Sequence, residues 1–124
     1  MLVVQVEREC DMHEMTLAEQ MLQIIEEAAV AQDFTQVKTV WMELGQLSCV
    51  EKEALRFCFS AVVDETIAQQ AKLEFIDIKG RGRCTQCECE MNISTIYGAC
   101  PACGSYAIQV IAGNEMRIRE LEVK

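Results

Sequence analysis

The chain has 124 residues, of which 51% are apolar, enough for one compact core and too many for a disordered chain. Its formal net charge of −9 disfavours a general binder of nucleic acids or anionic membranes, because phosphate groups would be repelled. No stretch approaches the roughly 20 apolar residues that cross a bilayer. The first residues carry neither a basic leader nor a long apolar run, so we expect a cytoplasmic protein.

The first predicted helix follows a capping box, in which Thr16 precedes Glu19 by three residues. Apolar residues then recur at helical spacing, and the pattern fades near Gln32 and Asp33. Residues 37–44 are rich in β-branched and aromatic side chains, which predicts a strand.

Ser48 and Glu51 form a second capping box, which predicts another helix over the apolar positions from Ala54 to Val62. Strands are predicted at residues 72–79, 106–111 and 115–123, and the pair Gly113 and Asn114 is typical of a hairpin between the last two. We therefore predict an α+β fold with two helices on a small, mostly antiparallel sheet, into which a cysteine-rich module is inserted.

Eight cysteines occur in the chain, and five of them lie between Cys84 and Cys103. Four of the five form two CxxC pairs separated by twelve residues, at Cys84, Cys87, Cys100 and Cys103. Paired CxxC knuckles aim four thiolates at one point, the tetrahedral arrangement of a zinc ribbon. Two disulfides or an iron site are the alternatives; a reducing compartment argues against the disulfides, and the spacing does not distinguish iron.

A zinc with four sulfur ligands has no open position for water, so we expect a structural or regulatory site and no catalysis. Cys89 is a fifth thiol beside the first pair; we interpret it as a bystander that could exchange with a ligand.

His13 is the only histidine, and it stands between Met12 and Glu14, directly before the first predicted helix. This motif, together with the cysteine module, closely resembles the HypA/HybF family of hydrogenase nickel-incorporation proteins. Four further stretches are similar to the family, at residues 41–45, 47–51, 57–59 and 113–122. The resemblance extends from Met12 to the C-terminus.

The resemblance implies a nickel metallochaperone that is not an enzyme. Nickel would be bound near Met12, His13 and Glu14, with Glu51 as a weaker candidate, and zinc would be held in the cysteine module. A HypB-type GTPase and the large subunit of [NiFe]-hydrogenase are the implied partners, with urease accessory proteins as a further possibility. Nitrogen donors from an amine, an amide and an imidazole suit Ni²⁺, which often takes square-planar nitrogen sets. We expect a monomer or a weak homodimer.

The sequence departs from the family in one respect, because eleven residues precede the Met-His-Glu motif that normally begins these proteins. Either the natural chain begins at Met12, which we favour, or the nickel site is altered by the loss of the free amine. Residues 2–6 have strand character and could pair with a sheet edge. We therefore divide the chain into an extension (1–11), a nickel-binding α+β domain (12–79 and 107–124) and a zinc module (80–106).

Two other classes share parts of the pattern. A zinc ribbon of the transcription or RNA machinery has the same cysteine spacing, but such modules usually carry basic residues. A small zinc hydrolase would need an open zinc position and a histidine near the module, and the sequence has neither.

Overall fold

The computed structural model describes residues 2–9, 14–94 and 98–124, with the backbone alone for residues 2–9. The elements are β1 (Leu2–Glu9), α1 (Glu14–Gln32), β2 (Val37–Gly45), α2 (Lys52–Val62), β3 (Lys72–Ile78), β4 (Arg81–Cys84), β5 (Glu90–Asn92), β6 (Ile108–Ala112) and β7 (Met116–Val123). They form two compact units. Unit 1 comprises Met1–Glu43, Val50–Ile76 and Met116–Lys124, and unit 2 comprises Leu44–Cys49 and Asp77–Glu115.

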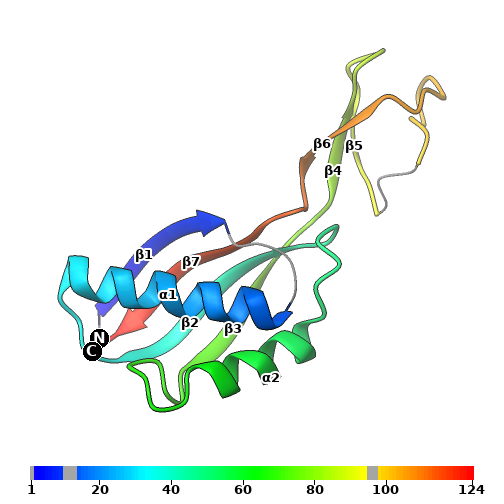
Figure 1. The fold of residues 1–124 in the computed structure, drawn as a ribbon. Helices are drawn as coiled ribbons and strands as arrows, with labels where there is room; N and C mark the ends of the chain where they lie inside the picture. The colour runs from blue at the N-terminus through cyan, green and yellow to red at the C-terminus, as the bar shows by residue number, and fades with distance from the viewer. Residues whose placement is uncertain (1, 10–13, 95–97) are drawn as a thin grey trace. The chain divides into compact units, whose positions relative to one another are not determined.

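Unit 1 is a four-stranded sheet in the order β1-β7-β2-β3, with α1 and α2 on one face (Figure 1). β1 and β7 are antiparallel, and β7 is antiparallel to β2, since the amide of Lys124 donates to the carbonyl of Gln36. β2 and β3 run in the same direction and are joined through α2. The predicted α+β class is thereby confirmed, as are the helices and strands of unit 1 in outline.

The core of unit 1 lies between the helices and the sheet. Its fully buried side chains come from α1, α2, β2 and β7, and include Leu17, Met21, Ile25, Leu55, Phe59, Val40, Met42, Ile118 and Leu121. In β2 the buried Val40 and Met42 alternate with Thr39 and Glu43, which therefore face the other side of the sheet. Among the described residues, no helix is long and apolar enough to span a bilayer.

The predicted capping box at Thr16 is wrong. α1 already begins at Glu14, so Thr16 is an exposed residue inside its first turn. The end of the helix is as predicted, because α1 stops at Gln32 and Asp33 takes a left-handed conformation with φ of 56°. The amide of Phe34 then donates to the carbonyl of Ala29 over 3.3 Å, which closes the last turn.

The capping box at Ser48 is also wrong. The hydroxyl of Ser48 donates to the carbonyl of Gly45 over 2.7 Å and so stabilises the turn that follows β2. Cys49 is left-handed, with φ of 61°, and the chain reaches α2 only at Lys52. Glu51 is the N-cap of α2, but its side chain makes no capping hydrogen bond.

Unit 2 contains a three-stranded antiparallel sheet in the order β5-β4-β6. The predicted hairpin at Gly113 and Asn114 is wrong, because β6 belongs to this sheet and β7 to the sheet of unit 1. Gly113 has φ of 108°, and its amide donates to the side chain of Glu115 over 2.7 Å. This glycine therefore marks the place where the chain leaves one sheet for another.

Three backbone segments of unit 2 meet at Gly45, Gly80 and Gly113 without a side chain between them. The amide of Leu47 donates to the carbonyl of Gly113 over 2.6 Å, and that of Ile93 donates to the carbonyl of Gly80 over 2.9 Å. A Cβ atom on Gly45 would lie 2.0 Å from the carbonyl oxygen of Gly113, and one on Gly113 would lie 2.5 Å from the Cα of Gly80. We call this contact the glycine crossing.

Glu43 is a buried carboxylate on the side of β2 that faces away from the helices. Arg117 of β7 donates to one of its oxygens over 2.7 Å, and Arg119 donates to the other. Burial opposes ionisation of Glu43, but the hydrogen bonds and charges of Arg119 and Arg117 outweigh it and hold the pKa below its usual value. The ion pairs thus join the two central strands of the sheet.

Replacement of Gly45 by Ala should destabilise unit 2 by more than about 2 kcal/mol, because the new methyl group would meet backbone that cannot move aside. Gly98→Ala is the matched control, since nothing lies within 4 Å of its Cβ position. Hydrogen exchange of the amides of Leu47 and Ile93 measures the effect, and equal exchange in the two variants would contradict the close approach.

Glu43→Gln should cost about 1–3 kcal/mol of unfolding free energy at neutral pH, because both arginines lose their anionic partner. The pKa of Glu43 is lower in the folded chain than in the unfolded chain. Its ionised carboxyl therefore stabilises the folded state at pH values above the unfolded pKa, and this stabilisation is lost as the pH falls through the folded pKa. Denaturation followed by the emission of Trp41, the only tryptophan, should therefore show a steeper acid loss in the parent chain than in Glu43→Gln. A surface variant, Glu26→Gln, should keep the parent slope.

Candidate metal centre

Two knuckles of unit 2 have the same backbone pattern. In the first, the amide of Cys84 donates to the carbonyl of Cys89 over 2.9 Å, and the amide of Glu88 donates to the carbonyl of Cys84 over 2.8 Å. Glu88 is left-handed, with φ of 62°. The first knuckle thus reverses the chain within six residues, and its first and last residues are joined by a backbone hydrogen bond.

The second knuckle repeats these bonds. The amide of Cys100 donates to the carbonyl of Ser105 over 2.7 Å, and that of Gly104 donates to the carbonyl of Cys100 over 2.8 Å. Gly104 is left-handed with φ of 78°, at the position that Glu88 occupies in the first knuckle. A glycine is typical of this conformation and a glutamate is not, so the sequence gives no signal for the left-handed turn at Glu88.

The four sulfurs of Cys84, Cys87, Cys100 and Cys103 converge, and all lie within 4.8 Å of one another. We call them the four-cysteine cluster. Across the knuckles, the Sγ atoms of Cys84 and Cys103 are 3.6 Å apart, and those of Cys87 and Cys100 are 3.7 Å apart. A tetrahedral zinc with Zn–S bonds of about 2.3 Å requires S···S edges of about 3.8 Å. These two edges therefore match those of a zinc tetrahedron.

The first cysteine of each knuckle is buried and the second is exposed. The backbone N–H of Cys87, with that of Gln86, outweighs burial and lowers the pKa of the Cys84 thiol to about 6. The N–H groups of Cys103 and Ala102 likewise lower the pKa of Cys100. Such N–H donors stabilise thiolates, which are the form that binds a metal.

The second cysteines show the opposite shift. The N–H of Cys89 favours the thiolate of Cys87, but burial and the hydrogen bonds with Cys100 and Cys103 together raise the pKa of Cys87 to about 12. Four neighbouring thiols do not all ionise, because like charges repel one another. A divalent cation at their centre would remove this repulsion, and its binding would release the remaining protons.

Cys89 lies outside the four-cysteine cluster, and its thiol donates to the carbonyl of Glu90 over 3.6 Å. It occupies the position that Ser105 holds in the second knuckle, directly after the turn. This equivalence explains why a fifth cysteine so close to the ligands does not join them.

The nickel candidates are described only in part. Met12 and His13 lie outside the described residues, whereas Glu14 is the half-buried first residue of α1. Glu51 is exposed directly before α2. Its side chain makes no capping hydrogen bond, so capping does not account for this residue.

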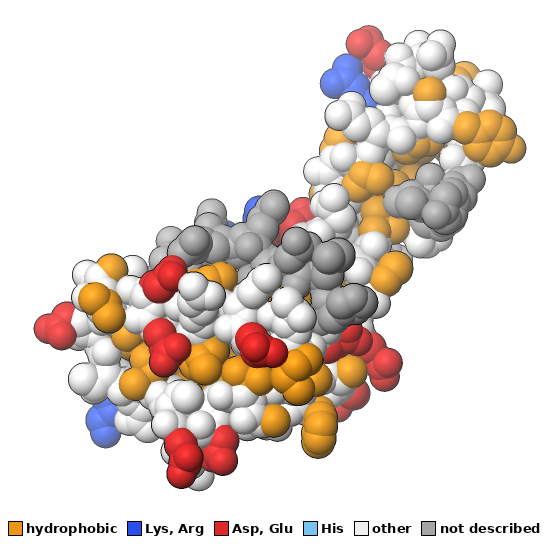
Figure 2. Space-filling model, in the orientation of Figure 1, with side chains coloured by type: hydrophobic (Ala, Val, Ile, Leu, Met, Phe, Trp, Pro, Cys, Tyr) orange, Lys and Arg blue, Asp and Glu red, His pale blue; other side chains and the backbone are white. Residues whose placement is uncertain are grey.

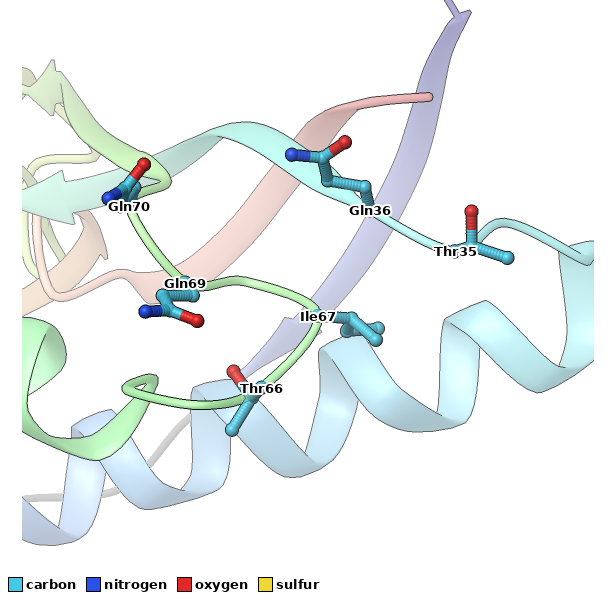
Figure 3. A pocket seen from close by; sticks show the side chains of 6 residues that line it. All are labelled: Thr35, Gln36, Thr66, Ile67, Gln69 and Gln70. Carbon is cyan, nitrogen blue, oxygen red and sulfur yellow. The ribbon is translucent and has the colours of Figure 1, made fainter.

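A hollow in unit 1 is lined by Thr35, Gln36, Thr66, Ile67, Gln69 and Gln70 (Figure 3). Its polar side chains are amides and hydroxyls that do not converge on one point, since Thr35 points away from Gln69 (Figure 3). None of the six is an acid, a base or a thiol. The hollow therefore offers no ionisable side chain for metal binding or proton transfer.

An α+β unit with an inserted four-sulfur ribbon defines a class of small metal-binding proteins in which the ribbon metal is fully ligated. Residues 12–123 match the family described as hydrogenase/urease nickel incorporation, metallochaperone, hypA. The chain belongs to this family, as the Met-His-Glu and cysteine motifs predicted.

Two relatives bear the name hydrogenase maturation factor HypA. The one from Azotobacter vinelandii is 49% identical over 113 residues, which are 91% of this chain and 100% of the relative. The one from Albidiferax ferrireducens is 50% identical over 113 residues, which are again 91% of this chain and 100% of the relative. A solution structure of the Ni metallochaperone HypA from Helicobacter pylori has a TM-score of 0.70 at 26% identity, and covers 90% of this chain and 97% of that one.

Cys84→Ala should remove the metal from the purified protein, because a three-sulfur site loses a charged ligand and the closed tetrahedron. Cys89→Ala is the matched control, and we expect it to keep one zinc per chain. Elemental analysis decides between these outcomes. Zinc retained by Cys84→Ala, or lost from Cys89→Ala, would show that the ligand set is different.

Proposed function

We propose that this chain is a nickel metallochaperone that binds Ni²⁺ and helps to deliver it to the large subunit of [NiFe]-hydrogenase. The observation that carries the proposal is the family match over residues 12–123, which begins at the Met-His-Glu motif. In this proposal Met12, His13 and Glu14 hold the nickel, and the ion is cargo. The nickel-binding role falls to residues 12–79 and 107–124.

The donor chemistry supports a transient carrier. A terminal amine, a backbone nitrogen and an imidazole on consecutive residues form small chelate rings, and such nitrogen sets suit Ni²⁺. Glu14 follows these residues directly in the sequence, and as the first residue of α1 it lies near the positive end of the helix dipole. Glu51 is a further candidate, because its carboxylate is exposed and makes no capping bond.

The four-cysteine cluster holds the second proposed metal, a structural zinc in residues 80–106. Its two S···S distances across the knuckles match a zinc tetrahedron, and the sulfurs of the buried Cys84 and Cys100 accept backbone N–H groups. A module of this size has little core of its own, so the metal supplies much of its folding free energy, on the order of 10 kcal/mol. Thiolate ligands also favour a reducing compartment, which supports a cytoplasmic location.

The proposed partners are a HypB-type GTPase and the hydrogenase large subunit, with urease accessory proteins as a further possibility. A ribbon of the transcription or RNA machinery is disfavoured by the surface charge. Acidic side chains are scattered over α1 and α2 on the face shown in Figure 2, and α1 contains no lysine or arginine. A nucleic-acid backbone would be repelled by this face.

Nickel binding should depend on His13 and on a free amine at Met12. An amide nitrogen must lose a proton to bind the metal, so the full chain should bind Ni²⁺ at least about tenfold more weakly than a chain that begins at Met12. His13→Ala should abolish tight binding in both forms. Isothermal titration measures the affinities, with Glu26→Gln on the exposed face of α1 as the control.

Equal affinities in the long and short forms would show that the amine is not a ligand. Tight binding that survives His13→Ala would move the site elsewhere, and titration of Glu51→Gln would then test the exposed carboxylate of α2.

A further inference from the structure

The sulfurs of the four-cysteine cluster form two contacts that cross from one knuckle to the other. Cys84 of the first knuckle lies 3.6 Å from Cys103 of the second, and Cys87 lies 3.7 Å from Cys100. Each contact joins a buried cysteine to an exposed one. A disulfide across each contact would therefore tie the two knuckles together where the proposed zinc holds them.

We propose that a hydroperoxide oxidises the four-cysteine cluster to two disulfides, Cys84–Cys103 and Cys87–Cys100, and that unit 2 stays folded in this metal-free form. The inference rests on the proposed zinc site. It gives the same four sulfurs a second covalent state, in which bonds between the knuckles replace the bonds to the ion.

Each disulfide consumes one molecule of hydroperoxide. A cysteine that holds a metal is a thiolate, which displaces hydroxide from hydrogen peroxide and becomes a sulfenic acid. Solvent reaches the exposed Cys87 and Cys103 for this step. The thiolate across the knuckles, from Cys100 or Cys84, then forms the S–S bond and displaces a second hydroxide. In total, four thiolates lose four electrons, and two peroxide molecules become four hydroxide ions, which take up four protons as water.

The distance between the paired sulfurs favours a reversible product. A sulfenic acid condenses with a neighbouring thiol, whereas one without a neighbour is oxidised further to a sulfinic acid that reductants do not restore. In both pairs the second sulfur already lies within 3.7 Å, so a small movement brings it to the bond length of about 2.05 Å. The pairing uses all four ligands, and a reductant with fresh zinc should regenerate the site.

The backbone of each knuckle is closed by hydrogen bonds of its own. The amide of Cys84 donates to the carbonyl of Cys89, and that of Cys100 donates to the carbonyl of Ser105. A disulfide within one knuckle, between Cys84 and Cys87, would close a turn that these bonds already close and would leave the two knuckles unlinked. Only bonds across the knuckles replace the connection that a metal makes.

Mass spectrometry of the zinc-loaded full chain after treatment with hydrogen peroxide tests the pairing. Free thiols are blocked with N-ethylmaleimide, and cleavage after Glu88 and Glu90 then separates the first knuckle from Cys89 and from the second knuckle. We expect one zinc released per chain, the peptides of the two knuckles joined by two disulfides, and Cys89 blocked. Fragmentation of the joined peptide between Cys84 and Cys87 assigns their partners.

Hydrogen exchange of the amides of Cys84 and Cys100 tests whether unit 2 stays folded. Both amides should remain protected in the oxidised, metal-free chain, and they should lose protection when a phosphine reduces the disulfides in the presence of a chelator. Zinc added to the reduced chain should restore it. Cys89→Ala is the matched control, and it should release zinc and form both disulfides as the parent chain does.

Disulfides within a knuckle, a disulfide that contains Cys89, or sulfinic acids in place of disulfides would overturn the proposal. So would zinc retained at peroxide concentrations that oxidise the exposed Cys49, or amides that lose protection in the oxidised chain. Elemental analysis before oxidation tests the zinc site separately. A chain purified without zinc refutes that site, whereas its disulfide pattern still decides the pairing.

Discussion

The direct backbone contact at the glycine crossing is the constraint from which the rest of the structure follows. β2 ends at Gly45, β4 begins after Gly80, and β7 begins after Gly113, so the chain enters and leaves unit 2 beside these three residues. Amide–carbonyl bonds join the segments where a Cβ would collide with backbone. The stretches 41–45 and 113–122, which resemble the family, meet at this contact.

The same two stretches also meet through Glu43 and its two arginines. β2 contributes a buried carboxylate and β7 contributes the guanidinium groups, so the charges fix which strands are neighbours and in which register. A strand shifted by one residue would leave a charge buried without a partner, which costs several kcal/mol. The glycines and the ion pairs thus act together on one pair of strands.

The sequence predicted most helices and strands and the convergence of the four module cysteines, because both depend on local periodicity and spacing. Cys84 and Cys103 are nineteen residues apart, yet the CxxC pairs alone indicated that their sulfurs meet. The capping boxes failed because the helices begin at other residues: α1 already includes Glu14, and α2 begins only at Lys52, so that Ser48 lies in the turn after β2. The hairpin failed because Gly113 serves a contact with Gly80, a residue distant in sequence.

The four-cysteine cluster has a kinetic consequence in the unequal exposure of its sulfurs. Each knuckle contributes one buried cysteine, Cys84 or Cys100, and one exposed cysteine, Cys87 or Cys103. In the proposed zinc site, an incoming chelator, thiol or oxidant would meet the two exposed cysteines first, so ligand exchange would start there while Cys84 and Cys100 still held the ion. Such a site would have no open coordination position, and yet it would lose its ligands in a fixed order.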